Sequence, residues 1–362
     1  MRFSKCFAIL SMLGLGSVLW AQTVTIHVPA DAPDIPSAIA QASSIINGPT
    51  PSDVVIKVNP GTYQGVFNLS SLNNPNHSVS LLAVKGPSVT LLERACLCGW
   101  VLQGTGARNF TLDGFSVRNR TTDPLNNPAN GIRLTDSTNI TVQNCAFDVS
   151  NQAMNFPVND PALSSRVQVV HNLVIAGDTN EVNPDLYGQG VSMVINDTYP
   201  STGEHRLSVA DNTFRTGASS VRFQHYVPDQ YGNVYRIALG GTLEMVRNDI
   251  TSWFAAAHNL IGGHDHYVAA NQIHDGQVGF YNMCGGSGVW ENNVLYNNIQ
   301  GAVFSFCLGI VRPITGEARI FRHNTIVNQK GTGFIYLDDG QPHDPLPVLY
   351  NNIVAFNNYA AS

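Results

Sequence analysis

The stretch Val169-Val170-His171-Asn172-Leu173-Val174 decides the fold of this 362-residue chain, because its pattern returns along much of the sequence. The pattern is an apolar residue, two further residues, an asparagine, any residue and another apolar residue. Its copies centre on Asn172, Asn212, Asn248, Asn271, Asn292, Asn324 and Asn351, and an earlier copy has Cys145 in the asparagine position. Repeats at intervals of 21 to 40 residues predict a solenoid, since one such unit cannot bury its apolar face alone.

Each copy is short, β-branched and alternating, which predicts a strand rather than a helix. A second pattern follows most copies and predicts the next strand of each coil. Its members are Gly131-Ile132-Arg133-Leu134, Gly190-Val191-Ser192-Met193, Ser220-Val221-Arg222-Phe223, Val278-Gly279-Phe280-Tyr281, Ala302-Val303-Phe304 and Gly333-Phe334-Ile335-Tyr336. An antiparallel β-sandwich also contains many short strands, but the same patterns in the same order favour an all-β parallel β-helix.

The asparagines of the first pattern are expected to form a ladder inside the solenoid. An inward asparagine at a turn can bond to its own backbone and to the asparagine of the next coil. This predicts that Asn271 is buried, whereas Asn298 is expected to lie in a turn outside the ladder.

The first 21 residues predict a secretion signal. Arg2 and Lys5 give a positive start, the run from Phe7 to Val18 is apolar, and Ala21 is the expected last residue before cleavage. That run is too short to span a membrane comfortably, and the sequence shows no second span. We therefore expect a secreted, periplasmic or cell-surface protein without a membrane span, whose single domain comprises residues 22–362.

The two ends of this domain differ. Residues 22–50 predict an N-terminal strand and a cap helix, with Val24 to Val28 alternating as the strand and Pro36 starting the helix after Asp34. The helix has one apolar face formed by Ile39, Ala42, Ile45 and Ile46. The last asparagine pattern is followed only by Ala355 to Ser362, so a partner or oligomer contact is allowed for the uncapped C-terminal coil.

The charge of the chain is low and mildly acidic. Its net charge of −6 becomes −8 once the two positive residues Arg2 and Lys5 are removed, and only 12% of its residues are charged. Such a surface does not suggest nucleic acid as a partner.

Six cysteines become five when Cys6 is removed with the signal, so at least one is unpaired. Cys284 and Cys307 occupy matching places in consecutive coils, and either a disulfide or two stacked free thiols fits this spacing. Cys96 and Cys98 are expected to lie too close along the chain to bond to each other easily.

Three segments resemble the secreted right-handed parallel β-helix proteins of the pectate-lyase-like superfamily. One runs from Val28-Pro29-Ala30-Asp31 through a short helix to the segment from Val54 to Tyr63, and resembles the opening of many such chains. The segments from Leu112 to Asn119 and from Gly131 to Phe147 are similar to their coil repeat. The resemblance implies a right-handed β-helix with an N-terminal helical cap, whose usual partner is a polysaccharide, often an acidic one. It also allows Ca²⁺, although the residues identify no cofactor and show no calcium-site pattern.

The motifs of the named subfamilies are incomplete. Gly61-Thr62-Tyr63-Gln64-Gly65 and Gln152-Ala153-Met154 are similar to phrases of pectin methylesterases, but their Asp-Phe-Ile-Phe-Gly phrase is absent. The paired Asp-Asp and Gly-His-Gly phrases of polygalacturonases are absent too. Arg312-Pro313 lacks the second arginine of the Arg-x-Pro-x-x-Arg phrase of pectate lyases. The subfamily therefore stays open.

The candidate catalytic residues are Arg222, His258 and Tyr281. If Val221 and Phe223 face inward, the alternation of the strands predicts that all three candidates face outward on consecutive coils. Arg222 would hold a sugar carboxylate in a fork, and His258 or Tyr281 would exchange a proton. The accompanying substrate-binding candidates are Gln224, His225, His264 and His266.

The segment His264-Asp265-His266 also allows a metal site as a short histidine-rich loop, but no metal is assigned.

These residues favour an enzyme that cleaves an acidic, uronate-containing polysaccharide by a lyase reaction. A non-catalytic β-helix that binds glycan or belongs to a surface assembly is the alternative. A glycoside hydrolase comes third, because no pair of carboxylates stands out for the two-carboxylate mechanism.

Overall fold

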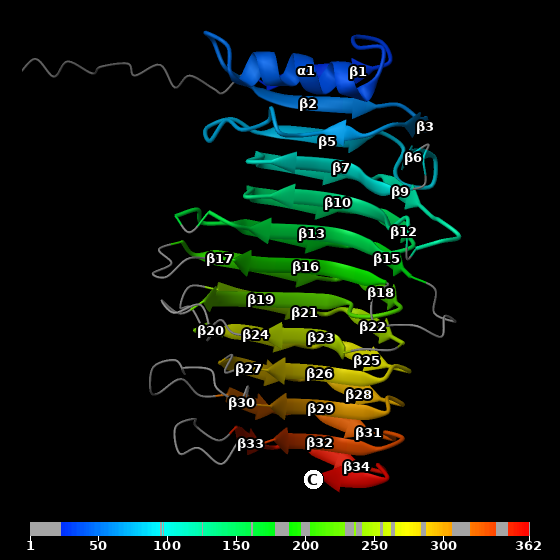
Figure 1. Cartoon of the computed structure of the whole chain (residues 1–362), viewed down its shortest axis with the longest axis vertical. Helices are drawn as coiled ribbons and strands as arrows, with labels where there is room; N and C mark the ends of the chain where they lie inside the picture. The colour runs from blue at the N-terminus through cyan, green and yellow to red at the C-terminus, as the bar shows by residue number, and fades with distance from the viewer. Residues whose placement is uncertain are drawn as a thin grey trace, which may run out of the picture.

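The chain winds into a solenoid of parallel strands in a computed structural model, drawn in Figure 1. The structure describes residues 23–361 except 95, 97, 125, 161, 178–187, 197–202, 229–234, 237–240, 254–255, 262–264, 284–286, 306–318 and 338–346. From β2 onward, successive described strands belong to sheets A, B and C in turn, and only β20 falls outside this order. Each coil therefore adds one strand to every sheet. This arrangement confirms the expected all-β, right-handed parallel β-helix with an N-terminal helical cap.

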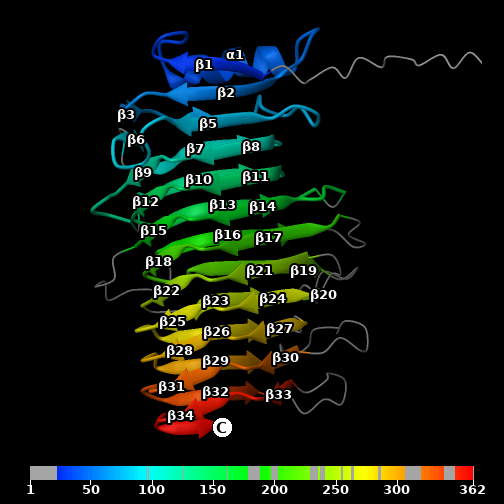
Figure 2. The ribbon, with the colours of Figure 1, turned by 180° about the vertical axis from the view of Figure 1, so that it is seen from behind.

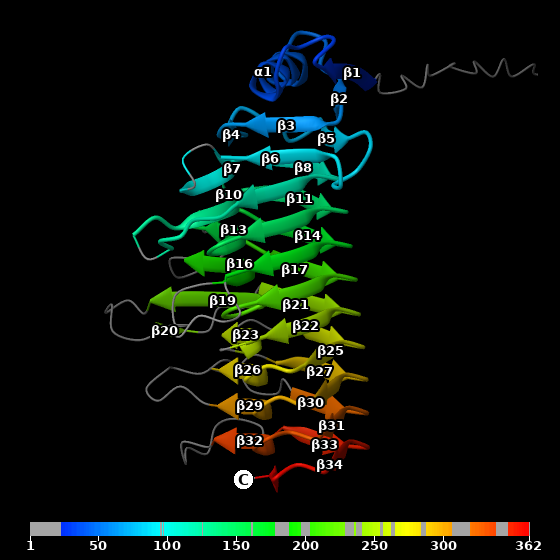
Figure 3. The ribbon, with the colours of Figure 1, turned by 90° about the vertical axis from the view of Figure 1, so that its right-hand side faces the viewer.

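The three sheets extend along the whole described solenoid, as Figures 2 and 3 show from two further sides. Sheet A contains β1 (Thr23–Val28), β2 (Asp53–Val58), β5 (Val79–Ala83), β8 (Arg108–Asp113), β11 (Thr138–Gln143), β14 (Arg166–Val170), β17 (His205–Ala210), β21 (Gly241–Val246), β24 (His266–Ala269), β27 (Gly288–Glu291), β30 (Arg319–Arg322) and β33 (Val348–Tyr350). Sheet B contains β3 (Gly61–Gln64), β6 (Thr90–Glu93), β9 (Ser116–Asn119), β12 (Ala146–Val149), β15 (Leu173–Ala176), β18 (Thr213–Thr216), β22 (Asp249–Ser252), β25 (Gln272–His274), β28 (Val294–Tyr296), β31 (Thr325–Val327) and β34 (Ile353–Ala355). Sheet C contains β4 (Phe67–Asn68), β7 (Gly99–Thr105), β10 (Ala129–Thr135), β13 (Gln152–Val158), β16 (Gln189–Asn196), β19 (Val221–Pro228), β23 (Ala256–Ile261), β26 (Val278–Met283), β29 (Gln300–Ser305), β32 (Thr332–Leu337) and β35 (Tyr359–Ala361), and β20 (Tyr235–Arg236) pairs antiparallel with β19.

The helix α1 (Ile35–Ile46) covers the N-terminal end of the core, as predicted (Figure 1). Asp34 caps it, because its carboxylate accepts a hydrogen bond of 2.8 Å from the backbone N–H of Ser37, and a proline occupies the first turn. The apolar face of α1 is buried against β1 and β2. The helix therefore shields the first coil from water.

The asparagine ladder runs through eight coils at the turn between sheets A and B. Its members are Cys145, Asn172, Asn212, Asn248, Asn271, Asn293, Asn324 and Asn352. The backbone N–H of each member except the last donates to the side-chain oxygen of the next at 2.8 to 3.0 Å. The side-chain amides also donate to buried backbone carbonyls, as Asn212 does to Val169. The ladder thus pairs buried polar groups that water cannot reach.

Two members of the ladder differ from the prediction. Asn293 and Asn352 belong to it, whereas Asn292 and Asn351 occupy the preceding position with left-handed φ angles of 56° and 53°. Where two asparagines are adjacent, the apolar pattern fits whether the first or the second of them is taken as the ladder residue. Packing decides between them, because Leu295, two residues after Asn293, is fully buried.

Asn298 was expected outside any ladder, and this expectation is wrong. It is 1% exposed, and its oxygen accepts a hydrogen bond from the backbone N–H of Gly276 at 3.0 Å. Its own N–H donates to Gln329, whose N–H donates to Asn357. A second, shorter ladder therefore supports the turn between sheets B and C in the last coils.

The second sequence pattern marks the start of strands in sheet C, as predicted. Its small residues are required by close packing of one coil on the next. A Cβ atom added to Gly190 would clash with the carbonyl oxygen of Ser220, and one added to Gly279 with that of Gly301. Glycine therefore lets the neighbouring backbones approach.

The last described coil exposes apolar side chains at the end opposite α1. Ile353 is 57% exposed and Phe356 is 89% exposed, and Leu349 is also exposed. A partner or oligomer contact at this coil stays a prediction. In the described part of the chain, no helix has the length and apolar character needed to cross a membrane.

Candidate functional site

One row of polar residues is aligned across the strands of sheet C. Strand pairing aligns Asn68, Gln103, Arg133, Asn155, Ser192, Arg222, Asn259 and Tyr281 in successive strands. Neighbouring positions in such a row are about 4.8 Å apart along the solenoid axis. Ser192, between Asn155 and Arg222, is only 1% exposed, so the exposed part of the row is interrupted there.

The strands of sheet C carry an unusual charge pattern. Within their described bounds they contain neither aspartate nor glutamate. On sheets A and B, by contrast, Arg118, Arg206, Arg215 and Arg322 pair with carboxylates at 2.6 to 2.8 Å. Among the described residues, Arg133 and Arg222 have no carboxylate partner. The positive charge of this face is therefore available to an anion from outside.

Arg222 is held at one end of its guanidinium group. Its Nη2 donates to Oε1 of Gln224 at 2.8 Å, and Gln224 is only 2% exposed. The Nε of Arg222 is buried and finds no acceptor in the structure described here. A buried donor without a partner is energetically costly, but this covered atom is not itself a contact point for a ligand.

The predicted alignment of His258 with Arg222 and Tyr281 is wrong in its register. His258 pairs with Val221 and Phe280, whose side chains are fully buried. Asn259 takes the position between Arg222 and Tyr281 instead. Each loop resets the phase of the next strand, so alternation counted along the sequence cannot carry across it. The catalytic roles of these residues stay predictions.

The remaining histidine candidates are not shown on the face. His225 pairs with buried Ile195, and the structure does not describe the side chains of His225 and His258. His264 lies outside the described residues, as do Cys284 and Cys307.

His266 is a core residue rather than a groove residue. It is 1% exposed, and its Nδ1 accepts a hydrogen bond of 2.9 Å from the backbone N–H of Leu243. Its ring packs edge-on against Phe223 at 5.6 Å between centroids. The expectation that His266 lines the substrate groove is therefore corrected, because its pairing with the backbone keeps it inside.

A pocket of about 290 Å³ opens on sheet C in the early coils. The sequence analysis did not predict this pocket. It is lined by Asn68, Ser70, Trp100, Gln103, Gly104, Thr105, Arg133 and Thr135. An aromatic ring beside amides, hydroxyls and one free arginine can hold a sugar by stacking and hydrogen bonding. Arg133 alternates with buried Ile132 and Leu134, so its outward position could be predicted from the sequence. The sequence does not show which strands lie beside it, and these strands complete the pocket.

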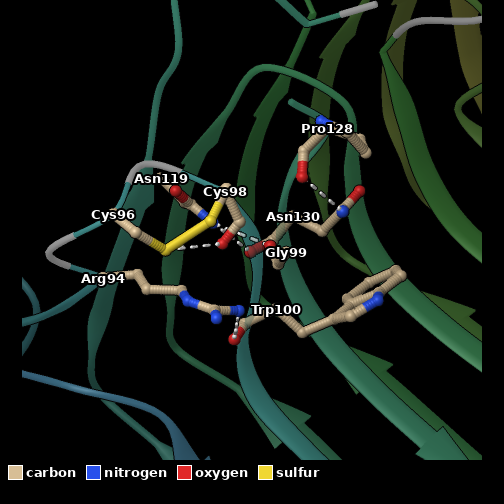
Figure 4. Close-up of a disulfide and its surroundings, with 8 residues drawn as sticks. All are labelled: Arg94, Cys96, Cys98, Gly99, Trp100, Asn119, Pro128 and Asn130. Atoms are coloured by element: carbon tan, nitrogen blue, oxygen red, sulfur yellow. Dashed lines mark hydrogen bonds between the residues drawn. A yellow bond between two sulfur atoms is a disulfide. The ribbon is translucent and has the colours of Figure 1, made fainter. Parts of the chain in front are cut away.

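The turn that leads into this pocket is closed by a disulfide between Cys96 and Cys98 (Figure 4). Their Cα atoms lie 5.3 Å apart, within the range that a disulfide needs, so the expectation that they do not bond is wrong. Arg94 donates to the carbonyl of Trp100 at 3.2 Å, and Asn119 donates to that of Gly99 at 2.9 Å. These contacts hold the backbone at the pocket's tryptophan.

The free thiol of Cys145 does not contribute to a surface site. It is buried in the first ladder, and burial raises its pKa to about 12. In the described part of the chain, His, Cys, Asp and Glu side chains do not converge in threes as metal ligands.

A separate charged network lies on the outer face of sheet B. Nε2 of His274 is 2.7 Å from Asp249, its Nδ1 is 2.7 Å from Asp275, and Arg215 also bonds Asp249. The ring of His274 stacks on Tyr296 with 4.8 Å between centroids. The hydrogen bond from His274 lowers the pKa of Asp275, with burial acting in the opposite direction. Burial raises the pKa of Asp249, but hydrogen bonds from Arg215 and His274 outweigh it and leave that pKa lowered.

These lowered pKa values predict a stabilising contribution that is lost in acid. It is complete above the unfolded-state pKa of about 3.9 and disappears as the pH falls through the lower folded-state values. We expect Asp275→Asn to destabilise the protein at neutral pH and to lose less stability than wild type on acidification. Urea unfolding midpoints measured from neutral pH down to about 3 check this. Parallel pH curves for the two proteins would contradict it.

Comparison with known proteins agrees at the level of the fold. No protein-family model matches the sequence, and no curated protein is detectably similar to it. Among solved structures, the polygalacturonase of Erwinia carotovora ssp. carotovora superposes with a TM-score of 0.52 at 12% identity, covering 91% of this chain and 97% of that one. The family 28 exopolygalacturonase of Yersinia enterocolitica gives a TM-score of 0.51 at 10% identity, covering 91% and 78%. The protein has the parallel β-helix fold of these two structures. At the level of the fold this confirms the resemblance noted in the sequence, and the subfamily stays open.

Proposed function

We propose that this is a secreted protein that binds an acidic polysaccharide on the outer face of sheet C and cleaves it by β-elimination. The observation that carries the proposal is the presence of Arg133 and Arg222, unpaired among the described residues, on a sheet whose strands have no carboxylates. The signal-like first 21 residues support an extracellular location.

The spacing of the two arginines favours a polymer. Three strand steps separate Arg133 from Arg222, which corresponds to about 14 Å along the row. A single sugar cannot reach both groups, whereas an oligomer of uronates presents a carboxylate to each. Trp100 and Gln103 in the early pocket would hold sugars further along the same chain.

The chemistry needs charge neutralisation and a proton carrier. Arg222 would bind the carboxylate of the reacting sugar and stabilise the negative charge that forms beside it. A base would remove the proton from the carbon next to the carboxylate. A carbon–carbon double bond would form as the bond to the glycosidic oxygen breaks, and that oxygen would take up a proton and leave as a hydroxyl group. Tyr281, in the same row two strands beyond Arg222, is the candidate for proton exchange.

Hydrolysis is the second candidate, because the two solved structures compared above are described as polygalacturonases. The two-carboxylate mechanism would have to recruit its acids from outside the strands of sheet C. A non-catalytic glycan-binding protein is the remaining alternative.

One assay separates the three candidates. The purified protein is incubated with uronic-acid polymers while ultraviolet absorbance and reducing ends are both followed. We expect absorbance from unsaturated uronides to rise together with reducing ends. Reducing ends alone would support a hydrolase, and neither signal with retained binding would support a binding protein.

A further inference from the structure

A second polar groove lies on sheet A, away from the face just described. Its volume is about 530 Å³, within the size range of ligand pockets. It crosses β14, β17 and β21 and is lined mainly by Arg166, Gln168, Glu204, Arg206, Ser208 and Glu244. In Figure 3, β14 and β17 lie on the opposite side of the solenoid from β16 and β19. The groove is therefore separate from the sheet C row.

Part of the groove is fixed by internal contacts. Arg206 bonds the carboxylate of Glu244 at 2.6 Å, and the hydroxyl of Ser208 donates to the same oxygen at 2.8 Å. Burial raises the pKa of Glu244, but these hydrogen bonds outweigh it and leave the pKa lowered. Glu244 is thus held as a carboxylate in a set position.

Other polar side chains of the groove have unused bonding capacity. Arg166, Gln168 and Glu204 are exposed, and their side chains have no hydrogen-bond partner among the described residues. Arg166 is aligned with Arg206 on the neighbouring strand. Donors and acceptors are therefore available together across the groove.

An aromatic platform continues the groove toward the C-terminal coils. Tyr267 pairs with Glu244 across β21 and β24 and is 40% exposed. Its hydroxyl donates to Glu291 at 2.8 Å, and Glu291 bonds Arg322 at 2.6 Å. The ring is therefore held in place before any ligand arrives, which lowers the entropy cost of stacking on it.

We propose that this groove binds a neutral oligosaccharide. The C–H face of a sugar ring would stack on Tyr267, and its neighbouring hydroxyl groups would bond to the groove's carboxylate, guanidinium and amide groups. Glu204 and Glu244 balance the charges of Arg166 and Arg206, so the groove carries no net positive charge to attract a polyanion, in contrast to the carboxylate-free strands of sheet C. The two faces would thus select different sugars, and the groove on sheet A would anchor the protein on a neutral glycan.

The test measures binding of the full mature chain to neutral oligosaccharides of glucose and xylose, and to oligogalacturonate, by calorimetry. We expect at least one neutral sugar to bind and Tyr267→Ala to weaken it about tenfold, the loss expected for a central contact. Arg166→Ala is expected to weaken the same sugar. Tyr267→Phe keeps the ring and should retain most of the binding, which separates stacking from a folding defect.

Matched variants distinguish this proposal from the function proposed for sheet C. Arg133→Ala should leave neutral-sugar binding unchanged and weaken the binding of oligogalacturonate. Tyr267→Ala should weaken neutral-sugar binding and leave the binding of oligogalacturonate unchanged. The proposal is overturned if wild type binds none of the neutral sugars, or if Arg133→Ala weakens them as much as Tyr267→Ala does. Failure of oligogalacturonate binding alone would overturn the sheet C function and not this one.

Discussion

Replacing Asn271 with alanine is expected to destabilise the protein by roughly 2–4 kcal/mol, because several buried partners lose their hydrogen bonds together. The side-chain oxygen of Asn271 accepts from the backbone N–H and side chain of Asn248 at 3.0 and 2.9 Å. Its amide donates to the carbonyl of Met245 at 2.9 Å. Chemical denaturation of the purified variant measures the loss in the free energy of unfolding.

Two further variants make this result specific. Gln272→Ala changes the neighbouring residue, which is exposed, and should shift stability by no more than about 0.5 kcal/mol. Asn298→Ala removes a member of the second ladder and should approach the effect of Asn271→Ala. If Asn271→Ala and Gln272→Ala were equally mild, the ladder would not stabilise the coils.

Replacing Arg222 with alanine is expected to lower turnover of an acidic polysaccharide by on the order of a hundredfold or more, as removal of a charge-stabilising donor does in other enzymes. Arg222 is the candidate for neutralising the substrate carboxylate, and its Nε is buried without an acceptor. The melting temperature should fall by only about a few degrees, since Arg222 has no ion pair among the described residues and the variant loses one hydrogen bond, to Gln224. Turnover and the thermal melt are measured on the same preparation.

The controls use other arginines of the chain. Arg222→Lys keeps the positive charge but cannot form the two parallel hydrogen bonds of a guanidinium group, so it should have only part of the wild-type activity. Arg215→Ala removes an arginine that is already paired with Asp249 on sheet B and should leave turnover near wild type. Full activity in Arg222→Ala would move the reaction to another part of the protein.

The sequence was sufficient for the architecture because that information is local and repeated. The coils repeat an apolar pattern, and the later coils also repeat an asparagine turn, so the strands, the first ladder and the Asp34-capped helix could be predicted from short segments. Adjacent asparagines left two registers open, and only the burial of Leu295 selected Asn293 over Asn292.

The candidate site depended on relations between coils that no short segment contains. Loops of different length reset the strand phase, which placed His258 beside Val221 and Phe280 instead of in the row of Arg222. His266 is likewise placed by a contact between coils, because its ring accepts a hydrogen bond from the backbone N–H of Leu243 on the neighbouring strand.

By itself the sequence determined the solenoid and much of what fills its interior, because inward positions must be apolar or ladder-forming in every coil. Only the tertiary structure decided which outward side chains share a row and which charges are already paired. Arg133 and Arg222 are distinguished from Arg206 by the strands beside them, and strand neighbours in a β-helix are set by loop lengths rather than by local sequence.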